Sequence, residues 1–578
     1  MEQKGLDFNF FIGMFLIFGL LMWFNINQVP NTSNQINEQA TIDNISEEQK
    51  SIIEKKSVKK SDLHIENYSI DYVDTVFYSL SNNHLSLKFS NYGACIKEVT
   101  LGNYFTYDSL DLKLIKDLDF NFSFFIKDQI LNSDQIIFQD VVQQKDKIIF
   151  THKDKYDNTI KFIYELVPNS YNLKFNVITE NGNTYVEPHK LLFAQNIHQL
   201  EKNFDNERNT TTINYSLNEN SSKQMSLMKD SEKTVENPFW VAHKQQFFST
   251  IISSENIFRE ASLSTYTPES NEYIKKLSSE FKIEYDNLNN NYAFNFYFFP
   301  NKYSLLKSFN KGFESLVPLG KFVFGWVNRF LVIPMFHFLD NMGLNYGLII
   351  LIIAFTIKFL LFLPTKSSYL SMAKMRVLKP EIDAINEKIK DPMQKQQAQM
   401  NLYRKTGVNP LGGCLPLLFQ MPILIALFRF FPASIELRQQ PFLWADDLST
   451  YDSILDLGFN IPLYGDHISL FALLMTGATV LQMMYSNQLS ANSQMPQMKY
   501  VMYMMPLIFL FVMNNYSAAL SYYYFLANLI TFAQQAIIRR SIDDEKLYAM
   551  LQANKKKPIK KSKFQQKLEE IAKKNQNR

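Results

Sequence analysis

The stretch from Asn345 to Pro364, NYGLIILIIAFTIKFLLFLP, constrains this chain more than any other. It is apolar and about as long as the ~20 residues that a helix needs to cross a bilayer, so it predicts a membrane span. One cation, Lys358, interrupts it. A lysine at the centre of a membrane helix costs about 2.5–3.5 kcal/mol. Lys358 therefore either reaches the head groups along its flexible stem or is kept for a function.

Five further apolar segments predict membrane helices of their own. The first lies at residues 8–26, and no small-x-small cleavage site follows it. We therefore interpret residues 1–26 as an uncleaved signal anchor rather than a removed signal peptide. The third of the remaining four is short for a hydrocarbon layer of ~30 Å. These four segments lie near residues 411–431, 467–485, 500–513 and 518–538.

The region between the first two spans is polar and has a different period. Residues 27–62 carry few large apolar groups and predict a flexible linker. Residues 63–303 alternate apolar and polar positions, as in SYNLKFNVIT at 170–179, which predicts half-buried antiparallel strands in a large β-sandwich. Residues 200–235 are rich in Asn and Ser and predict a long surface loop. Residues 304–342 mix aromatic and charged residues, which favours a connector helix in the membrane surface, interrupted near Pro334, over a core helix of the β-domain.

The span that carries Lys358 is followed by a polar, basic segment at residues 366–409, with nine Lys/Arg and four Asp/Glu. Asp391 and Pro392 are typical of a helix start, and Gly407 is typical of a helix end. The segment therefore predicts a helical hairpin outside the membrane. Its first arm offers candidate contacts to varied partners, although its methionines can equally serve packing between the two helices. These candidates are Met372, Lys374, Met375, Arg376 and Lys379.

The net charge of +3 is unevenly distributed, and this asymmetry predicts orientation. Residues 539–578 carry thirteen Lys/Arg, whereas the loops at 433–466 and 514–517 together carry one, Arg438. Positive charge is retained on the cytoplasmic side. We expect both termini and the hairpin in the cytoplasm and the β-domain outside. The basic tail suits ribosomal RNA, and it equally suits anionic lipid.

Polar residues inside the predicted spans can join helices or line a wet cavity. Together with Lys358 they form a candidate groove: Gln420, Gln482, Tyr523, Tyr524, Asn528, Gln534 and Gln535. The sequence has no GxSxG, HExxH or P-loop motif, and its two cysteines and eight histidines show no zinc-binding spacing. We expect no catalytic residues, no cofactor and no metal.

Three stretches carry a family resemblance. They are LPTKSSYLSMAKMRVLKPEI (363–382), YRKTGVNPLGGCLPLLFQMPILIALF (403–428) and SIELRQQPFLWADDLS (434–449). Through them the chain resembles the YidC/Oxa/Albino family of membrane protein insertases, over about residues 322–540. The order of an anchor and a β-domain is similar to that of Gram-negative members with a periplasmic β-supersandwich. The resemblance implies a multi-span α-helical inner membrane protein with six transmembrane helices, a five-helix insertase core at 343–538, and a periplasmic all-β supersandwich domain.

The same resemblance implies a function that needs no hydrolysis, and hence a protein that is not an enzyme. It implies an insertase and chaperone for nascent membrane proteins, which acts alone or beside the Sec translocon, receives substrates from ribosomes and works in contact with membrane lipids. The groove is open to the cytoplasm, and Lys358 stands where well-known members commonly have arginine. Arginine stays charged, whereas a desolvated lysine can lose its proton.

Two rival functions remain to be compared. A secondary transporter would show an inverted repeat around a midplane site, and the sequence shows no internal repeat. A membrane-anchored periplasmic carbohydrate-active enzyme would leave five spans and the hairpin without a purpose.

Overall fold

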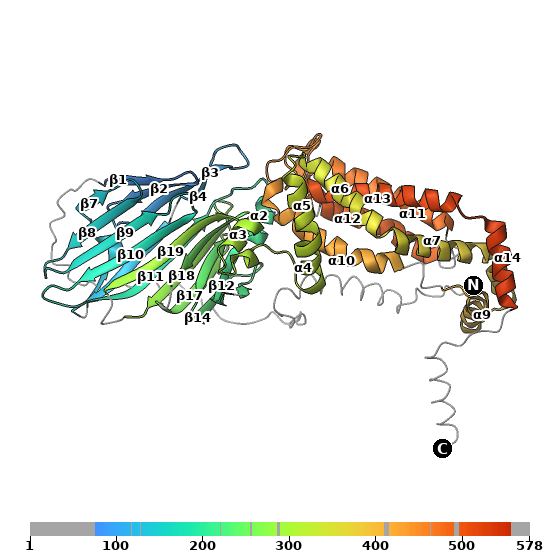
Figure 1. Cartoon of the computed structure of the whole chain (residues 1–578), viewed down its shortest axis with the longest axis horizontal. Helices are drawn as coiled ribbons and strands as arrows, with labels where there is room; N and C mark the ends of the chain where they lie inside the picture. Colours follow the sequence, from blue (N-terminus) through green and yellow to red (C-terminus); the bar gives the residue numbers. More distant parts are fainter. Residues whose placement is uncertain are drawn as a thin grey trace, which may run out of the picture. The chain divides into compact units, whose positions relative to one another are not determined.

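The computed structural model describes residues 75–556 except 117, 128, 220, 255–256, 286–289, 410–414, 463 and 490–495. The predicted anchor, the predicted linker and the last 22 residues of the tail lie outside this part of the chain. The chain divides into two compact units. Unit 1 runs up to Phe299 without residues 201–203, and unit 2 comprises Glu201–Asn203 and the chain from Pro300 onward. Strands make up most of unit 1, and helices make up most of unit 2 (Figure 1).

The described residues of unit 1 form three β-sheets. The four-stranded sheet has the order β1 (Phe77–Ser81), β2 (Leu85–Ser90), β3 (Ile96–Phe105), β4 (Asp111–Ile115). The six-stranded sheet has the order β14 (Ser231–Glu236), β17 (Phe258–Tyr266), β18 (Lys275–Ile283), β11 (Val186–Ile197), β5 (Leu118–Ile126), β6 (Gln129–Asn132). The nine-stranded sheet has the order β13 (Ser221–Gln224), β12 (Thr212–Asn218), β15 (Trp240–Lys244), β16 (Phe248–Ser253), β19 (Asn291–Pro300), β10 (Asn172–Glu180), β9 (Thr159–Leu166), β8 (Lys147–Lys153), β7 (Asp140–Gln143).

The two larger sheets pack face to face through aromatic side chains. Phe122 of β5 contacts Phe162 of β9 and Phe294 of β19, with ring centroids 5.8 and 5.9 Å apart. Phe175 of β10 is fully buried and pairs antiparallel with Phe294. Such edge-to-face contacts stabilise a core beyond simple burial. The predicted strand at 170–179 and the sandwich packing are therefore present in the structure.

The predicted surface loop at 200–235 is wrong. The segment forms helix α2 (Phe204–Thr210), then β12, β13 and β14. In β12 the apolar Ile213 is buried, and so are the polar Thr212 and Asn214 on either side of it. Thr212 is satisfied inside the protein because its hydroxyl donates to the carbonyl of Met225 at 3.3 Å. Because polar residues occupy buried positions here, the composition suggested a loop where the backbone forms a strand.

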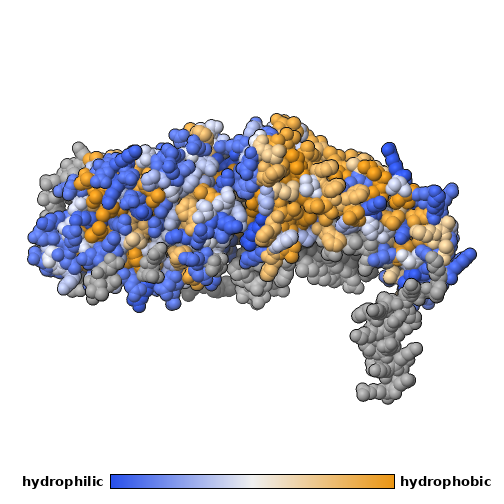
Figure 2. Space-filling model, in the orientation of Figure 1, coloured by the Kyte–Doolittle hydropathy of each residue, from blue (hydrophilic) through white to orange (hydrophobic). Residues whose placement is uncertain are grey.

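Unit 2 contains most of the helices and one β-hairpin. They are α3 (Tyr303–Ser308), α4 (Phe322–Val327), α5 (Ile333–Asp340), α6 (Tyr346–Leu360), α7 (Phe362–Val377), α8 (Lys379–Lys388), α9 (Pro392–Thr406), α10 (Leu415–Phe430), β20 (Leu455–Ile461), β21 (Gly465–Ile468), α11 (Leu470–Leu489), α12 (Pro496–Asn514), α13 (Ala518–Arg540) and α14 (Asp544–Lys555). Hydrophobic residues gather over these helices, whereas the visible face of unit 1 is mainly hydrophilic (Figure 2).

Within the described ranges, one continuous helix, Phe322–Asp340, is long and apolar enough to cross a membrane. A second qualifies if α6 and α7 are counted as one bent span. Shorter apolar helical segments lie at Phe419–Ala433, Leu470–Ser486 and Met504–Asn514. Length and composition alone therefore do not fix the number of spans.

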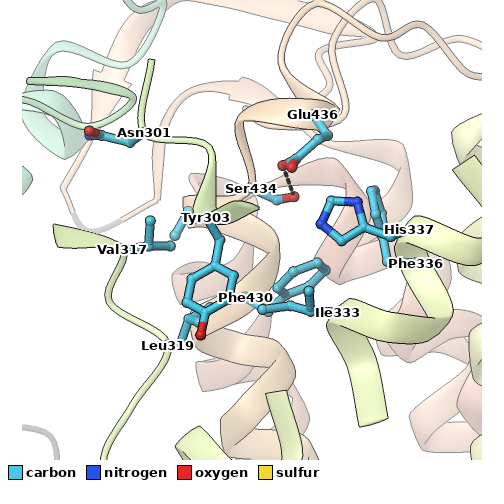
Figure 3. Close-up of a pocket in the computed structure, with 11 residues that line it drawn as sticks. Asn301, Tyr303, Val317, Leu319, Ile333, Phe336, His337, Phe430, Ser434 and Glu436 are labelled. Atoms are coloured by element: carbon cyan, nitrogen blue, oxygen red, sulfur yellow. Dashed lines mark hydrogen bonds between the residues drawn. The ribbon is translucent and has the colours of Figure 1, made fainter. Parts of the chain in front are cut away.

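The helix at 322–340 is continuous, so the predicted interruption near Pro334 is wrong. A π-helical turn, Asn328–Val332, joins α4 to α5, and Pro334 falls at the first turn of α5. The same helix borders a small pocket lined by Ile333, Phe336 and His337, with Ser434 and Glu436 opposite (Figure 3).

The helix predicted at 345–364 breaks before its end. α6 begins where the side chain of Asn345 caps Gly347 N at 2.9 Å, and it ends at Leu360. α7 then starts at Phe362 and is bent by 59° from α6. Pro364 explains the break, since its ring would collide with the carbonyl of Leu360 and it has no N–H to donate. Lys358 therefore lies in the last turn of α6.

Two other predicted spans have different limits. α11 begins at Leu470 rather than 467, because His467 belongs to strand β21. α12 runs from Pro496 to Asn514 and is longer than the predicted short span at 500–513, because a polar first turn extends the helix. Its apolar part, Met504–Asn514, is short. α10 and α13 agree with the predictions at 411–431 and 518–538 to within a few residues.

Unit 2 also contains a buried ion pair that was not predicted from the sequence. Arg438 Nε donates to Glu201 Oε1 at 2.9 Å and to Oε2 at 3.0 Å. The two residues are 5% and 6% exposed. Burial raises the pKa of Glu201 to about 7, although the charge of Arg438 opposes this shift. The negative charge of the nearby Asp447 raises the pKa of Glu201 further.

Candidate functional site

Lys358 is buried, with 4% of its surface exposed. Its Nζ donates to Gln420 Oε1 of α10 at 3.2 Å. No carboxylate in the part of the chain that the structure describes forms an ion pair with it. Lys358 is therefore held by a neutral amide, without a negative partner from these residues, in a place where an unpaired charge is costly.

The second half of the site comes from α13. Gln534 Nε2 donates to the main-chain carbonyl of Lys358 at 3.1 Å. Carbonyls in the last turn of a helix have no intrahelical partner, so this amide fixes the end of α6 to α13. The neighbouring Gln535 is 2% exposed and donates to the hydroxyl of Ser486 at 3.0 Å and to that of Tyr369.

One more hydrogen bond connects α13 with α11. Asn528 Nδ2 donates to Thr479 Oγ1 at 2.7 Å. Gln482 is half-buried and lies on α11 between Thr479 and Ser486. Spacings of three and four residues place these three side chains on one face of the helix. The structure thus connects α6, α7, α10, α11 and α13 through buried polar groups around Lys358.

Two of the predicted groove residues belong to a different environment. Tyr523 packs against Phe431, and Tyr524 packs against Phe509, each at a centroid distance of 5.8 Å. Tyr523 precedes Gln534 by eleven residues, or ~16 Å along a helix. The tyrosines therefore form an aromatic cluster rather than a part of the network at Lys358.

The sequence analysis missed Tyr369, Thr479 and Ser486. Thr479 and Ser486 carried a usable signal, because they share a helix face with Gln482. Tyr369 carried none, since only the bend after α6 brings it to Gln535.

The predicted helical hairpin at 366–409 is present. Asp391 caps α9 by accepting from Met393 N at 2.9 Å and from Gln394 N at 2.8 Å. Gly407 ends the helix with φ +71°, a conformation that glycine adopts without strain. Both local signals in the sequence therefore had the expected structural effect.

The candidate contact residues of the hairpin differ in exposure. Met375 is buried in a cluster with Leu378, Ile382, Leu402, Tyr403, Val408 and Leu551, and Met372 packs at its edge. Lys379 is exposed, and Lys374 is half-buried. Met375 therefore packs inside the hairpin, which is the alternative that the sequence left open.

Helix α14 packs on the hairpin, so the predicted basic tail at 539–578 is not one uniform segment. Leu551 of α14 is 1% exposed in the cluster around Met375. Arg376 pairs with Asp544 at 2.6 Å. Glu381 accepts hydrogen bonds from Gln552 and Lys555. Burial would raise the pKa of Glu381, yet the hydrogen bonds from these two residues and the charge of Lys555 hold it below its usual value.

Comparison with known proteins identifies the family. A model described as "60Kd inner membrane protein" matches residues 337–545, and one described as "YidC periplasmic domain" matches residues 78–338. The chain is 39% identical over 522 residues to a protein named membrane protein insertase YidC from Parabacteroides distasonis, covering 86% of this chain and 82% of that one. It is 38% identical over 577 residues to the protein of that name from Amoebophilus asiaticus, covering 96% of each. The chain belongs to the YidC membrane protein insertase family.

YidC proteins are insertases of the inner membrane rather than enzymes, and the β-sheets of unit 1 correspond to the periplasmic domain of the YidC family. A solved galactose mutarotase-like protein from Lactobacillus casei resembles the chain with a TM-score of 0.27 and 9% identity, over 39% of this chain and all of that one. A likeness at this level carries no argument about YidC activity.

Proposed function

We propose that this chain inserts nascent membrane proteins through a polar groove in which Lys358 attracts acidic residues of the arriving segment. The observation that supports this proposal is the buried ammonium with an amide partner and no carboxylate partner among the described residues. An acidic side chain of a substrate supplies the missing counter-charge. Two unit charges 4 Å apart attract by about 4 kcal/mol at an effective dielectric constant of 20.

The other polar groups of the groove bind the substrate backbone. The amides of Gln420, Gln482, Asn528, Gln534 and Gln535 and the hydroxyls of α11 replace hydrogen bonds that a polar segment loses when it leaves water. The apolar part of the substrate then moves sideways into lipid, where it is favoured. No step requires nucleotide hydrolysis.

We further propose six spans, comprising the anchor at 1–26 and a five-helix core of α6, α10, α11, α12 and α13. The excess of Lys/Arg in the hairpin and tail supports a cytoplasmic place for both. The helix at 322–340 lies along the periplasmic membrane surface in this arrangement. Four large aromatic side chains on it are more than half exposed and suit the interface: Phe322, Trp326, Phe330 and Phe338.

A crosslinking experiment tests the groove. Single cysteines are placed at Gln482, inside the groove, and at Phe355 of α6, which is 60% exposed. Cys95 and Cys414 are first replaced by alanine. A ribosome-stalled membrane protein with one cysteine in its first span should crosslink to position 482 several-fold more than to position 355. Equal crosslinking at the two positions, or crosslinking at 355 alone, would reject the groove as the substrate path.

The proposed partners are the Sec translocon, which shares substrates in the family that this sequence resembles, and the ribosome. Residues 557–578 carry eight Lys/Arg and two Glu, which suits the phosphates of ribosomal RNA.

A truncation after Lys556 isolates this tail, whereas a truncation from 545 would also remove α14 and expose the hairpin cluster. We expect the truncation to weaken ribosome co-sedimentation and to flatten its dependence on salt. A full-length variant with glutamine at the eight basic positions should behave in the same way. Unchanged co-sedimentation of either variant would exclude the tail as the contact and leave lipid as its partner.

A further inference from the structure

The hairpin of β20 and β21 presents exposed apolar side chains. Ile454 is 49% exposed, Leu455 is 55% exposed and Phe459 is 63% exposed. Leu455 pairs with Ile468 and Asp456 pairs with His467, so adjacent residues at this end of the hairpin point to opposite faces. A bulge between Asp456 and Ile461, where Gly458 has φ +73°, turns the strand before Phe459. We call Leu455 and Phe459 the hairpin patch, because Ile454 directly precedes Leu455 and points to the opposite face.

The base of this hairpin is fixed to the ends of two helices. Asn514, the last residue of α12, donates through Nδ2 to the carbonyls of Tyr464 and His467, each at 2.9 Å. Its Oδ1 accepts from Ser469 N at 2.9 Å, directly before α11 begins. His467 Nε2 donates back to the carbonyl of Asn514 at 2.8 Å. These bonds hold the hairpin at the level where α11 begins and α12 ends.

The apolar surface continues from α12 to the hairpin. Tyr464 packs edge to face on Phe511 of α12, with centroids 5.2 Å apart. On α12, Leu507, Ile508 and Val512 are each about half exposed, at 54%, 45% and 48%. Exposed apolar residues on a helix of a membrane protein face lipid. The hairpin patch therefore adjoins a surface that lipid covers, just beyond the end of the span.

We propose that the hairpin patch inserts into the interfacial layer of the bilayer and anchors the ends of α11 and α12 there. A paired hairpin keeps its internal hydrogen bonds, and its outer edges can bond to water and head groups at this depth. Asp456 is exposed and accepts a bond from Ser453 at 2.6 Å, so the face opposite Leu455 carries a charged group for water. An apolar patch with a polar rim at a helix end suits the membrane interface.

A protein partner fits these observations less well than lipid. A stable protein interface buries about 800 Å² on each side and includes some 20–30 residues. The hairpin patch has two side chains, and the surface that continues it is the lipid-facing side of α12. The inference goes beyond the insertase function, and it depends on α12 being a span.

The test uses the full chain with Cys95 and Cys414 replaced by alanine, reconstituted in vesicles of phosphatidylethanolamine and phosphatidylglycerol. Single cysteines at Leu455, Phe459, Asp456 and Ile508 carry an environment-sensitive fluorophore. Asp456 is the matched control, because it follows Leu455 directly and points to the opposite face. Ile508 reports on α12. Quenching is measured with lipids that carry a nitroxide near the head group.

We expect several-fold stronger quenching at positions 455 and 459 than at position 456, together with a blue-shifted emission. Quenching at 455 and 459 no stronger than at 456, while 508 is quenched, would overturn the hairpin proposal and leave the span intact. A blue shift at 455 and 459 without lipid quenching would also overturn it, since the occupant would then be protein. Absence of lipid quenching at position 508 would reject α12 as a span and the hairpin proposal with it.

Discussion

Replacing Lys358 by alanine is expected to reduce, by at least about tenfold, the insertion of substrates whose outer segments carry acidic residues. An attraction of a few kcal/mol is lost, and 1.4 kcal/mol corresponds to a factor of ten. Lys358→Arg should retain insertion, because arginine keeps the charge. The measurement is protease protection of newly made substrate in membrane vesicles, supported by growth of a strain depleted of its own insertase.

The contact with Gln420 offers a sharper control. Gln420→Glu leaves Lys358 in place but puts a carboxylate where the amide oxygen now accepts its hydrogen bond at 3.2 Å. This internal ion pair should compete with the substrate, so we expect Gln420→Glu to resemble Lys358→Ala with acidic substrates. Both variants should insert a matched substrate without acidic residues normally. Normal insertion of acidic substrates by Lys358→Ala would remove the attraction mechanism for this protein.

Breaking the buried ion pair of Glu201 and Arg438 is expected to cause a large loss of stability. Glu201→Leu leaves the guanidinium buried beside Asp447, and arginine cannot give up its charge. Breaking a buried pair typically costs about 3–5 kcal/mol. We expect a loss near the lower end of this range, because Asp447 still balances part of the charge. Thermal unfolding of the full chain in detergent measures it.

Replacing Arg438 instead should reduce stability less, because the carboxylate that is left can be neutralised by a proton. Arg438→Met leaves Glu201, whose pKa is already raised to about 7 by burial, and Asp447, whose pKa burial also raises. Below these raised values the folded state binds protons that the unfolded state does not, so stability falls as pH rises. The stability of Arg438→Met should therefore be closer to that of the wild type at about pH 6 than at about pH 8. Equal losses of stability for the two single variants at both pH values would contradict this asymmetry. The double variant Glu201→Leu/Arg438→Met should recover part of the lost stability.

Local signals in the sequence predicted local structure well. Alternating residues at 170–179 form β10, and Asp391 and Gly407 cap α9 as expected. These features depend on neighbours in the chain, which a sequence displays directly. Asn214 and Ser216 failed as loop signals because the environment of a strand, rather than its composition, decides what can be buried there.

The candidate site was predicted in its chemistry but not in its geometry. Hydrogen bonds join Lys358 to Gln420 and Gln534, and Gln535, the next residue, bonds to Tyr369 and Ser486. Tyr369 reaches Gln535 because Pro364 breaks the helix, and the size and direction of such a bend depend on tertiary packing. Tyr523 packs on Phe431 instead, and the sequence could not predict this, because an apolar helix with several polar residues does not reveal which of its faces meets which neighbour.

The bond from Gln534 to Lys358 has a consequence for how this position can change over evolutionary time. Gln534 contacts the main chain at 358, which every amino acid provides, rather than the ammonium group. A lysine and an arginine are therefore equivalent to it, and the end of α6 stays attached to α13 whichever of them is present. A substitution at 358 can therefore change the charge and reach of the side chain without releasing the end of α6 from α13.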